Sequence, residues 1–309
     1  MLNKRILLPV DTSDHSLKSV QYIAKMFPSE QTEVVLFHVY SQLEDFFSSL
    51  DIAPDPNQYK LTDLLKSHKA LLDDFMVKAR SVLLESGFSE SNITIKMKLQ
   101  SLPSIAMEIL EESRSNYHVI VVGRTGISQL NEYLGNTAAS LVNSVKHIPL
   151  IVVDHVPSDN NVLIAYDASE SANRAVDSLG ELLEGTSFNV TIYHVVKALK
   201  YSLIGIIQIL PSKEFEDQYY KKHRDDMKVL IEEAQQRLIE KGIGEGQLST
   251  EIDVGLNSRA HAILAKSKKD NYGTIVVGRR GERLTDIDIG TVGRKLVGLA
   301  SNATIWIVS

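Results

Sequence analysis

Two eight-residue motifs of this chain recur in similar form and in the same order, about 155 residues apart. The segment Ile6–Ser13 (ILLPVDTS) returns as Val162–Ser169 (VLIAYDAS), and Val119–Gly126 (VIVVGRTG) returns as Thr274–Gly281 (TIVVGRRG). This period is far longer than the 20 to 50 residues of a solenoid unit. Each copy is therefore expected to fold as a domain with its own hydrophobic core.

The copies are joined by a short polar stretch, residues 154–161 (DHVPSDNN), which contains a proline. We place the domain border there, with a first domain over residues 1–156 and a second over 157–309. A length of 309 residues also favours about two domains.

Short β-branched runs alternate with longer helical patterns in each copy, which is typical of βαβ units and a parallel sheet. The predicted strands cover residues 5–10, 33–39, 93–99, 119–123 and 150–154 in the first copy, and 161–166, 189–195, 249–254, 274–278 and 304–308 in the second. The predicted helices cover residues 13–27, 59–86, 103–115 and 136–146, and then 169–183, 212–241, 258–269 and 291–300. The pattern predicts two α/β domains, each with a five-stranded parallel sheet flanked by helices.

Composition excludes several classes of function. The net charge is −6 and neither half is basic, so nucleic acid is not an expected partner. The absence of cysteine excludes disulfides and thiolate chemistry. The longest apolar run, Tyr201–Leu210, is about half as long as a membrane span, and no signal segment opens the chain, so a cytoplasmic location is expected. This run has three candidate roles: a lid over the ligand crevice expected at the strand ends of the second domain, a dimer contact, or the lining of an apolar pocket.

An aspartate follows the first predicted strand of each copy, Asp11 and Asp167. In an open parallel sheet, ligands bind beyond the carboxyl ends of the strands, where a carboxylate can accept hydrogen bonds from a base amine or a ribose hydroxyl. The alternative is that each aspartate caps the following helix.

A glycine loop follows the fourth predicted strand of each copy. Its glycines are Gly123, Gly126 and Gly135 in the first copy, and Gly278, Gly281 and Gly290 in the second. Glycines let backbone approach a phosphate closely, and the helix that begins after the last one offers free N–H groups to an anion. Side-chain donors for that anion would be Asn136, Thr137 and Thr291. The alternative is a tight turn between strand and helix with no ligand.

The order of these motifs, with VD.S or YD.S, then HV, then VVG..G and a later G[N/T], resembles the universal stress protein family over almost the whole chain. The resemblance implies a tandem arrangement of two Rossmann-like five-stranded domains with strand order 3-2-1-4-5. It also implies an adenine nucleotide, ATP or AMP with or without Mg²⁺, bound by a G-x2-G-x9-G-[S/T] loop.

Carried over by position, the resemblance assigns the base and ribose to Asp11 and Val39 in the first copy, and to Asp167 and Val195 in the second. It assigns the ribose and phosphates to the loop glycines named above and to Thr291. Both copies have eight residues instead of nine before the last glycine, and Asn136 replaces the hydroxyl residue in the first copy. The second copy is therefore the preferred nucleotide site.

In this family the last strand of each domain pairs across a two-fold axis, so the resemblance also implies a pseudo-dimer within one chain, or a homodimer. His38 and His194, which follow apolar runs at matching positions, are interpreted as packed strand-end residues. The glycines of GIGEGQ (residues 242–247) follow a predicted helix and precede a strand, so they are interpreted as a helix end and loop.

The sequence contains no P-loop, nucleophile elbow or zinc-protease motif. The expected function is a stress-response protein that binds an adenine nucleotide as a regulatory module, with occupancy changing a surface that a protein partner recognises. Two alternatives stay open. One is a slow ATP hydrolase of the adenine-nucleotide hydrolase superfamily, and the other is a module for a protein or an apolar ligand with degenerate nucleotide sites.

Overall fold

The computed structural model describes residues 4–41, 56–126, 134–199, 212–279, 290–300 and 302–309. The chain divides into two compact units, Met1–Asp154 and His155–Ser309. Among the predicted features, Gly281 and the apolar run Tyr201–Leu210 lie outside the described residues.

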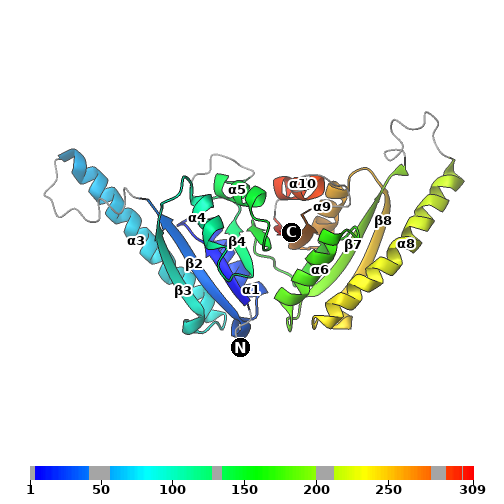
Figure 1. Ribbon diagram of the computed structural model, residues 1–309, viewed down its shortest axis with the longest axis horizontal. Coiled ribbons are helices and arrows are strands. Elements are labelled where there is room, and N and C mark those ends of the chain that lie inside the picture. The colour runs from blue at the N-terminus through cyan, green and yellow to red at the C-terminus, as the bar shows by residue number, and fades with distance from the viewer. Residues whose placement is uncertain (1–3, 42–55, 127–133, 200–211, 280–289, 301) are drawn as a thin grey trace. The chain divides into compact units, whose positions relative to one another are not determined.

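The first unit is a parallel sheet in the order β3-β2-β1-β4-β5, with helices on both faces (Figure 1). Helices α1 and α3 pack together on one face, and α4 and α5 pack together on the other. The elements are β1 (Lys4–Pro9), α1 (Asp14–Met26), β2 (Thr32–Tyr40), α3 (Pro56–Glu85), β3 (Ile93–Leu99), α4 (Ile105–Glu112), β4 (Val119–Gly123), α5 (Asn136–Ser144) and β5 (Leu150–Val153).

The second unit has the same topology, with the order β8-β7-β6-β9-β10. Its elements are β6 (Asn161–Ala165), α6 (Glu170–Leu183), β7 (Asn189–Lys197), α8 (Lys213–Glu240), β8 (Leu248–Leu256), α9 (Arg259–Lys269), β9 (Thr274–Gly278), α10 (Thr291–Leu299) and β10 (Thr304–Val308). Short 3-10 helices precede β2, β3 and β8, at Ser29–Gln31, Glu90–Asn92 and Glu245–Gln247. The predicted fold class and the strand order 3-2-1-4-5 are confirmed in both units.

The central strands are buried on both faces, which explains why they are continuous apolar runs instead of alternating patterns. In β1 the side chains of Ile6, Leu7 and Leu8 are all fully buried, and so are Ile275 and Val276 in β9. Each such side chain stabilises the fold by about 1.5–3 kcal/mol relative to an exposed position. The core of each unit thus fixes the central strands, whose carboxyl ends carry the predicted site residues.

The loop at residues 242–247 is a helix end, as predicted. Helix α8 stops at Glu240, and Gly242 has a φ of 87°, a left-handed conformation that favours glycine at the end of a helix. The 3-10 helix Glu245–Gln247 then leads into β8. This glycine cluster therefore has a structural role.

A buried carboxylate, Glu108, ties α4 to β3 and to the loop between them. It is fully buried and lies 2.8 Å from the ammonium of Lys98. Its Oε1 accepts hydrogen bonds from the backbone N–H groups of Ser101 and Leu102. Burial acts to raise the pKa of Glu108, but the lysine and these hydrogen bonds outweigh it and lower the pKa to about 2.

A second ion pair joins a helix to the edge strand in both units, but the acid and the base have changed places between the two units. In the first unit, Lys96 of β3 lies 2.8 Å from Glu112 of α4. In the second unit, the acid is on the strand and the base on the helix, because Glu251 of β8 pairs with Lys266 of α9. The sheet registers make the two strand positions equivalent, since Ile93 pairs with Val34 and Leu248 with Val190. The duplication has therefore conserved the contact and exchanged the charges.

Candidate functional site

Asp11 and Asp167 lie just beyond the carboxyl ends of β1 and β6, as predicted. One oxygen of Asp11 accepts from the backbone N–H of Ser13 at 2.9 Å and from the hydroxyl of Ser16 at 2.6 Å. Asp167 accepts from the N–H of Ser169 at 3.1 Å. Each aspartate thus closes a turn at the strand end that holds its carboxylate in place.

The helix caps are the serines that follow, because the hydroxyl of Ser13 caps α1 and that of Ser169 caps α6. The alternative in which the aspartates cap these helices is therefore wrong. In the second unit the turn includes Ala168, whose φ of 60° lies in a region that non-glycine residues rarely adopt. Such strained backbone is concentrated at functional sites.

In the first unit, the glycine loop is brought directly against the aspartate. A Cβ added to Gly126 would lie 2.6 Å from Oδ2 of Asp11, so only glycine fits there without displacing the carboxylate. The N–H of Gly135 then donates to the carbonyl of Arg124 at 2.8 Å, which closes the loop back onto the end of β4. In the second unit Gly290 donates to Arg279 in the same way, at 2.5 Å.

Gly123 and Gly278, the last residues of β4 and β9, have a packing role that needs no ligand. A Cβ at Gly123 would lie 2.9 Å from the backbone carbon of His15 in α1, and one at Gly278 would lie 2.6 Å from the backbone of Ser171 in α6. These glycines let the first turn of each helix approach the sheet. Their contact with a ligand stays a prediction.

The helices that follow the glycine loops differ from their neighbours at the N-terminus. A serine directly precedes each of helices α1, α4, α6, α8 and α9, and its side chain accepts from a backbone N–H of the first turn. In α5 and α10 the capping position before the helix is instead a glycine, Gly135 or Gly290, which has no side-chain cap. The first helical residues are Asn136 followed by Thr137 in α5, and Thr291 in α10; Asn136 and Thr291 are exposed. First-turn N–H groups without a side-chain acceptor are what an anion binds.

Val39 and Val195 lie near the ends of β2 and β7, and their side chains are only 8% and 4% exposed. The histidines beside them are buried, and each donates from Nδ1 to the carbonyl of the residue that directly follows the first strand of its unit, His38 to Val10 at 2.8 Å and His194 to Tyr166 at 2.7 Å. The interpretation of both histidines as packed strand-end residues is confirmed. They fix the backbone just before each aspartate.

Sequence reasoning missed Arg259, the first residue of α9. Its Nε donates to the carbonyl of Val195 at 3.3 Å, so the guanidinium lies at the carboxyl end of β7, beside the predicted base and ribose residues. No motif marks this arginine. Alignment of the two capping serines, Ser104 and Ser258, would have shown that Ile105 stands at the equivalent position of the first unit.

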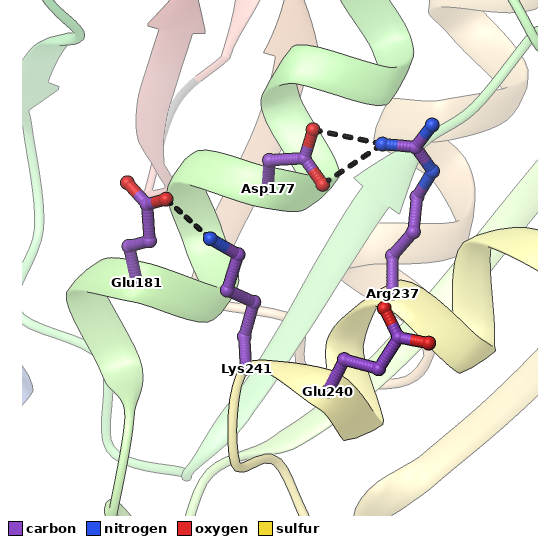
Figure 2. Close-up of a pocket in the computed structure, with 5 residues that line it drawn as sticks. All are labelled: Asp177, Glu181, Arg237, Glu240 and Lys241. Carbon is purple, nitrogen blue, oxygen red and sulfur yellow. Dashed lines mark hydrogen bonds and ion pairs between the residues drawn. The ribbon is translucent and has the colours of Figure 1, made fainter.

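A polar hollow of about 480 Å³ lies elsewhere, between α6 and α8 (Figure 2). Two ion pairs cross it, Arg237 with Asp177 at 3.0 Å and Lys241 with Glu181 at 2.6 Å. Lys241 also packs on Gly180, where an added Cβ would lie 2.7 Å from that of the lysine. The two pairs join the helices and account for four of the five charged residues that line the hollow, while the fifth, Glu240, accepts from the side chain of Gln236 on its own helix.

A model of the Universal stress protein family matches residues 2–154 and matches again over residues 160–307. The chain belongs to the universal stress protein family. The two matches account for the internal repeat, so the tandem arrangement predicted from the repeat is confirmed. None of the helices in the described part of the chain is long and apolar enough to cross a membrane.

Similar proteins agree with this membership. Universal stress protein YxiE of Bacillus subtilis is 27% identical over 146 residues, which are 46% of this chain and 94% of that protein. The crystal structure of a universal stress protein from Archaeoglobus fulgidus matches 99% of this chain and 98% of its own, with a TM-score of 0.58 and 20% identity. A functionally unknown protein of Pseudomonas aeruginosa PAO1 matches 99% and 92%, with a TM-score of 0.57 and 14% identity. At these identities the solved structures support the two-unit fold.

Proposed function

We propose that this universal stress protein binds an adenine nucleotide, ATP or AMP, at the carboxyl ends of β6, β7 and β9, and acts as a regulatory binding module in the cytoplasm. The observation that carries the proposal is the N-terminus of α10. It follows the glycine loop, lacks a side-chain cap and exposes Thr291 at its first position. A phosphate there would accept from the first-turn N–H groups and from the threonine hydroxyl.

The base and ribose would lie at the other end of the site, against Asp167 and Val195. Gly278, Gly281 and Gly290 would border the phosphates, and Mg²⁺ would be held by the phosphates themselves. The first unit offers the same frame in Asp11, Val39, Gly123, Gly126, Gly135, Asn136 and Thr137. It is the weaker candidate, because an amide replaces the hydroxyl at the first helical position.

Occupancy is the proposed mechanism. A bound nucleotide would change a surface that a protein partner recognises. Pairing of the final strands, β5 and β10, within one chain or in a homodimer would complete the proposed assembly.

Isothermal titration calorimetry of the full chain with AMP and with ATP tests the proposal. Asp167→Asn is the sharpest variant, because an asparagine oxygen can still accept from the Ser169 N–H while the carboxylate charge is lost. We expect it to weaken binding by about 10-fold or more. Asp11→Asn is the matched control in the first unit and should change the affinity of the second site by less than twofold.

Absence of heat and of any thermal shift with either nucleotide would refute the proposal. The remaining function classes give different results in the same samples. Phosphate release from ATP that disappears in Asp167→Asn would identify a hydrolase. A lipid retained on freshly purified protein in native mass spectrometry, without nucleotide binding, would identify an apolar-ligand module.

A further inference from the structure

The guanidinium of Arg259 is held at one end and has unused donors at the other. Its Nε donates to the Val195 carbonyl at 3.3 Å, and the side chain is exposed. Within the described residues its two terminal nitrogens form neither a hydrogen bond nor an ion pair. An arginine with a fixed Nε and free terminal donors presents a planar fork to an acceptor group.

The fork stands near the predicted base and ribose residues. His194, next to Val195 in β7, bonds the carbonyl of Tyr166, which directly precedes Asp167. The charges of Arg259 and Asp167 both act on this histidine. Burial lowers the pKa of His194, and Arg259 lowers it further, while the Tyr166 hydrogen bond and Asp167 act to raise it. The lowered pKa favours the neutral imidazole, so the permanent positive charge beside Val195 is that of Arg259.

The first unit lacks this charge. The position after its capping serine is Ile105, an apolar side chain that is 43% exposed. Both helices are capped in the same way, with the serine hydroxyl accepting from the third helical N–H, so the two positions are geometrically equivalent. An exposed isoleucine leaves room for an arginine there without disturbance of the core.

We infer that Arg259 determines ligand specificity in the second unit by binding acceptor atoms at the nucleoside end of the nucleotide. Two sources supply such acceptors: the ring nitrogens of the base, and a second phosphate attached to a ribose hydroxyl, in addition to the 5′-phosphate. The inference rests on the proposed function, because it takes the nucleotide to lie between Val195 and Thr291. It also gives the two units different ligand preferences despite their shared fold.

The test uses the full chain with Asp11→Asn as the parent, so that calorimetry reads the second site. AMP and adenosine 3′,5′-bisphosphate are titrated into the parent, Arg259→Ala and Arg259→Lys. Arg259→Ala should weaken at least one ligand by about 10-fold or more, and Arg259→Lys should restore only part of the affinity, because lysine lacks the fork. A loss with AMP identifies the base as the source, and a loss confined to the bisphosphate identifies the ribose phosphate.

Two further variants complete the design. Lys241→Ala removes a positive charge from the hollow of Figure 2 and should leave both affinities within twofold. Ile105→Arg, read in an Asp167→Asn background, should strengthen binding by the first unit by about 10-fold. If Arg259→Ala binds both ligands within twofold of the parent, the inference is wrong while the proposed function stands. If neither the parent nor the unmodified chain binds either ligand, both are wrong.

Discussion

Replacement of Glu108 by glutamine tests how the α4 helix is held on the sheet. Glutamine keeps the size of the side chain and an oxygen that accepts from the Ser101 and Leu102 N–H groups. It removes the charge that faces Lys98 at 2.8 Å. The glutamate has no exposed surface, so solvent screens this interaction weakly.

The magnitude follows from the pKa of Glu108. The difference between the ordinary 4.5 and about 2 corresponds to about 3 kcal/mol, since each pKa unit is worth about 1.4 kcal/mol. Because the folded-state pKa is lowered, this stability is fully present above pH 4.5 and is lost as the pH falls from 4.5 towards 2. Glutamine keeps the two N–H hydrogen bonds that contribute to the lowered pKa, so Glu108→Gln should lower the free energy of unfolding by about 1–3 kcal/mol at pH 7 and by much less at pH 2.

Urea unfolding followed by far-UV circular dichroism measures both values. The matched control is Glu111→Gln. Glu111 lies about one turn further along the same helix, is exposed, and its carboxylate pairs with Arg114 at 3.5 Å. That control should cost less than about 0.5 kcal/mol. A cost below about 1 kcal/mol for Glu108→Gln at pH 7, or the same cost at pH 7 and pH 2, would refute the argument.

Two more perturbations address packing and charge. Lys96→Glu should lower the free energy of unfolding by about 1 kcal/mol, because the new carboxylate would face the buried Glu112. Adding Glu112→Lys should recover only part of this stability, because the Tyr117 hydroxyl loses its acceptor. A double-mutant cycle that shows no coupling between the two positions would contradict this. Gly278→Ala should cost about 1–3 kcal/mol in a urea titration, because its Cβ would meet the Ser171 backbone at 2.6 Å. The control is Gly298→Ala inside α10, where an added Cβ would have no atom of the described residues within 4 Å beyond the adjoining backbone of its own helix. This variant should raise the free energy of unfolding by about 0.5–1 kcal/mol. Equal effects of the two alanines would exclude close helix approach as the reason for Gly278.

The sequence predicted the fold well because the signals were strong and repeated. Short β-branched runs such as Val119–Gly123 and Thr274–Gly278 are typical of the buried strands of a parallel sheet, and both strands begin and end where predicted. Helix starts were less well placed. The helix predicted from residue 103 begins at Ile105, because Ser104 accepts from the Met107 N–H as the cap. Capping depends on one hydroxyl, which a hydrophobic pattern does not contain.

The candidate site was predictable where a motif recurs at the same place in both copies, as the aspartates and glycines do. Gly126 was predicted from the glycine loop that recurs in both copies, and the structure adds a steric reason, because a Cβ there would meet the Asp11 carboxylate. Arg259 could not be predicted, since an arginine at the start of a helix is common and its contact with Val195 joins residues 64 positions apart. Such contacts follow from the crossover of α9 over the sheet, which no local pattern encodes.

The reversed ion pairs have a consequence for how a duplicated chain folds. Each repeat contains a helix and an edge strand that could in principle be exchanged for those of the other. If α4 docked on β8, Glu112 would meet Glu251, and if α9 docked on β3, Lys266 would meet Lys96. Both wrong pairings place like charges together, whereas both native ones place opposite charges together. The exchange of charges between the copies thus favours the docking of each helix on the sheet of its own repeat.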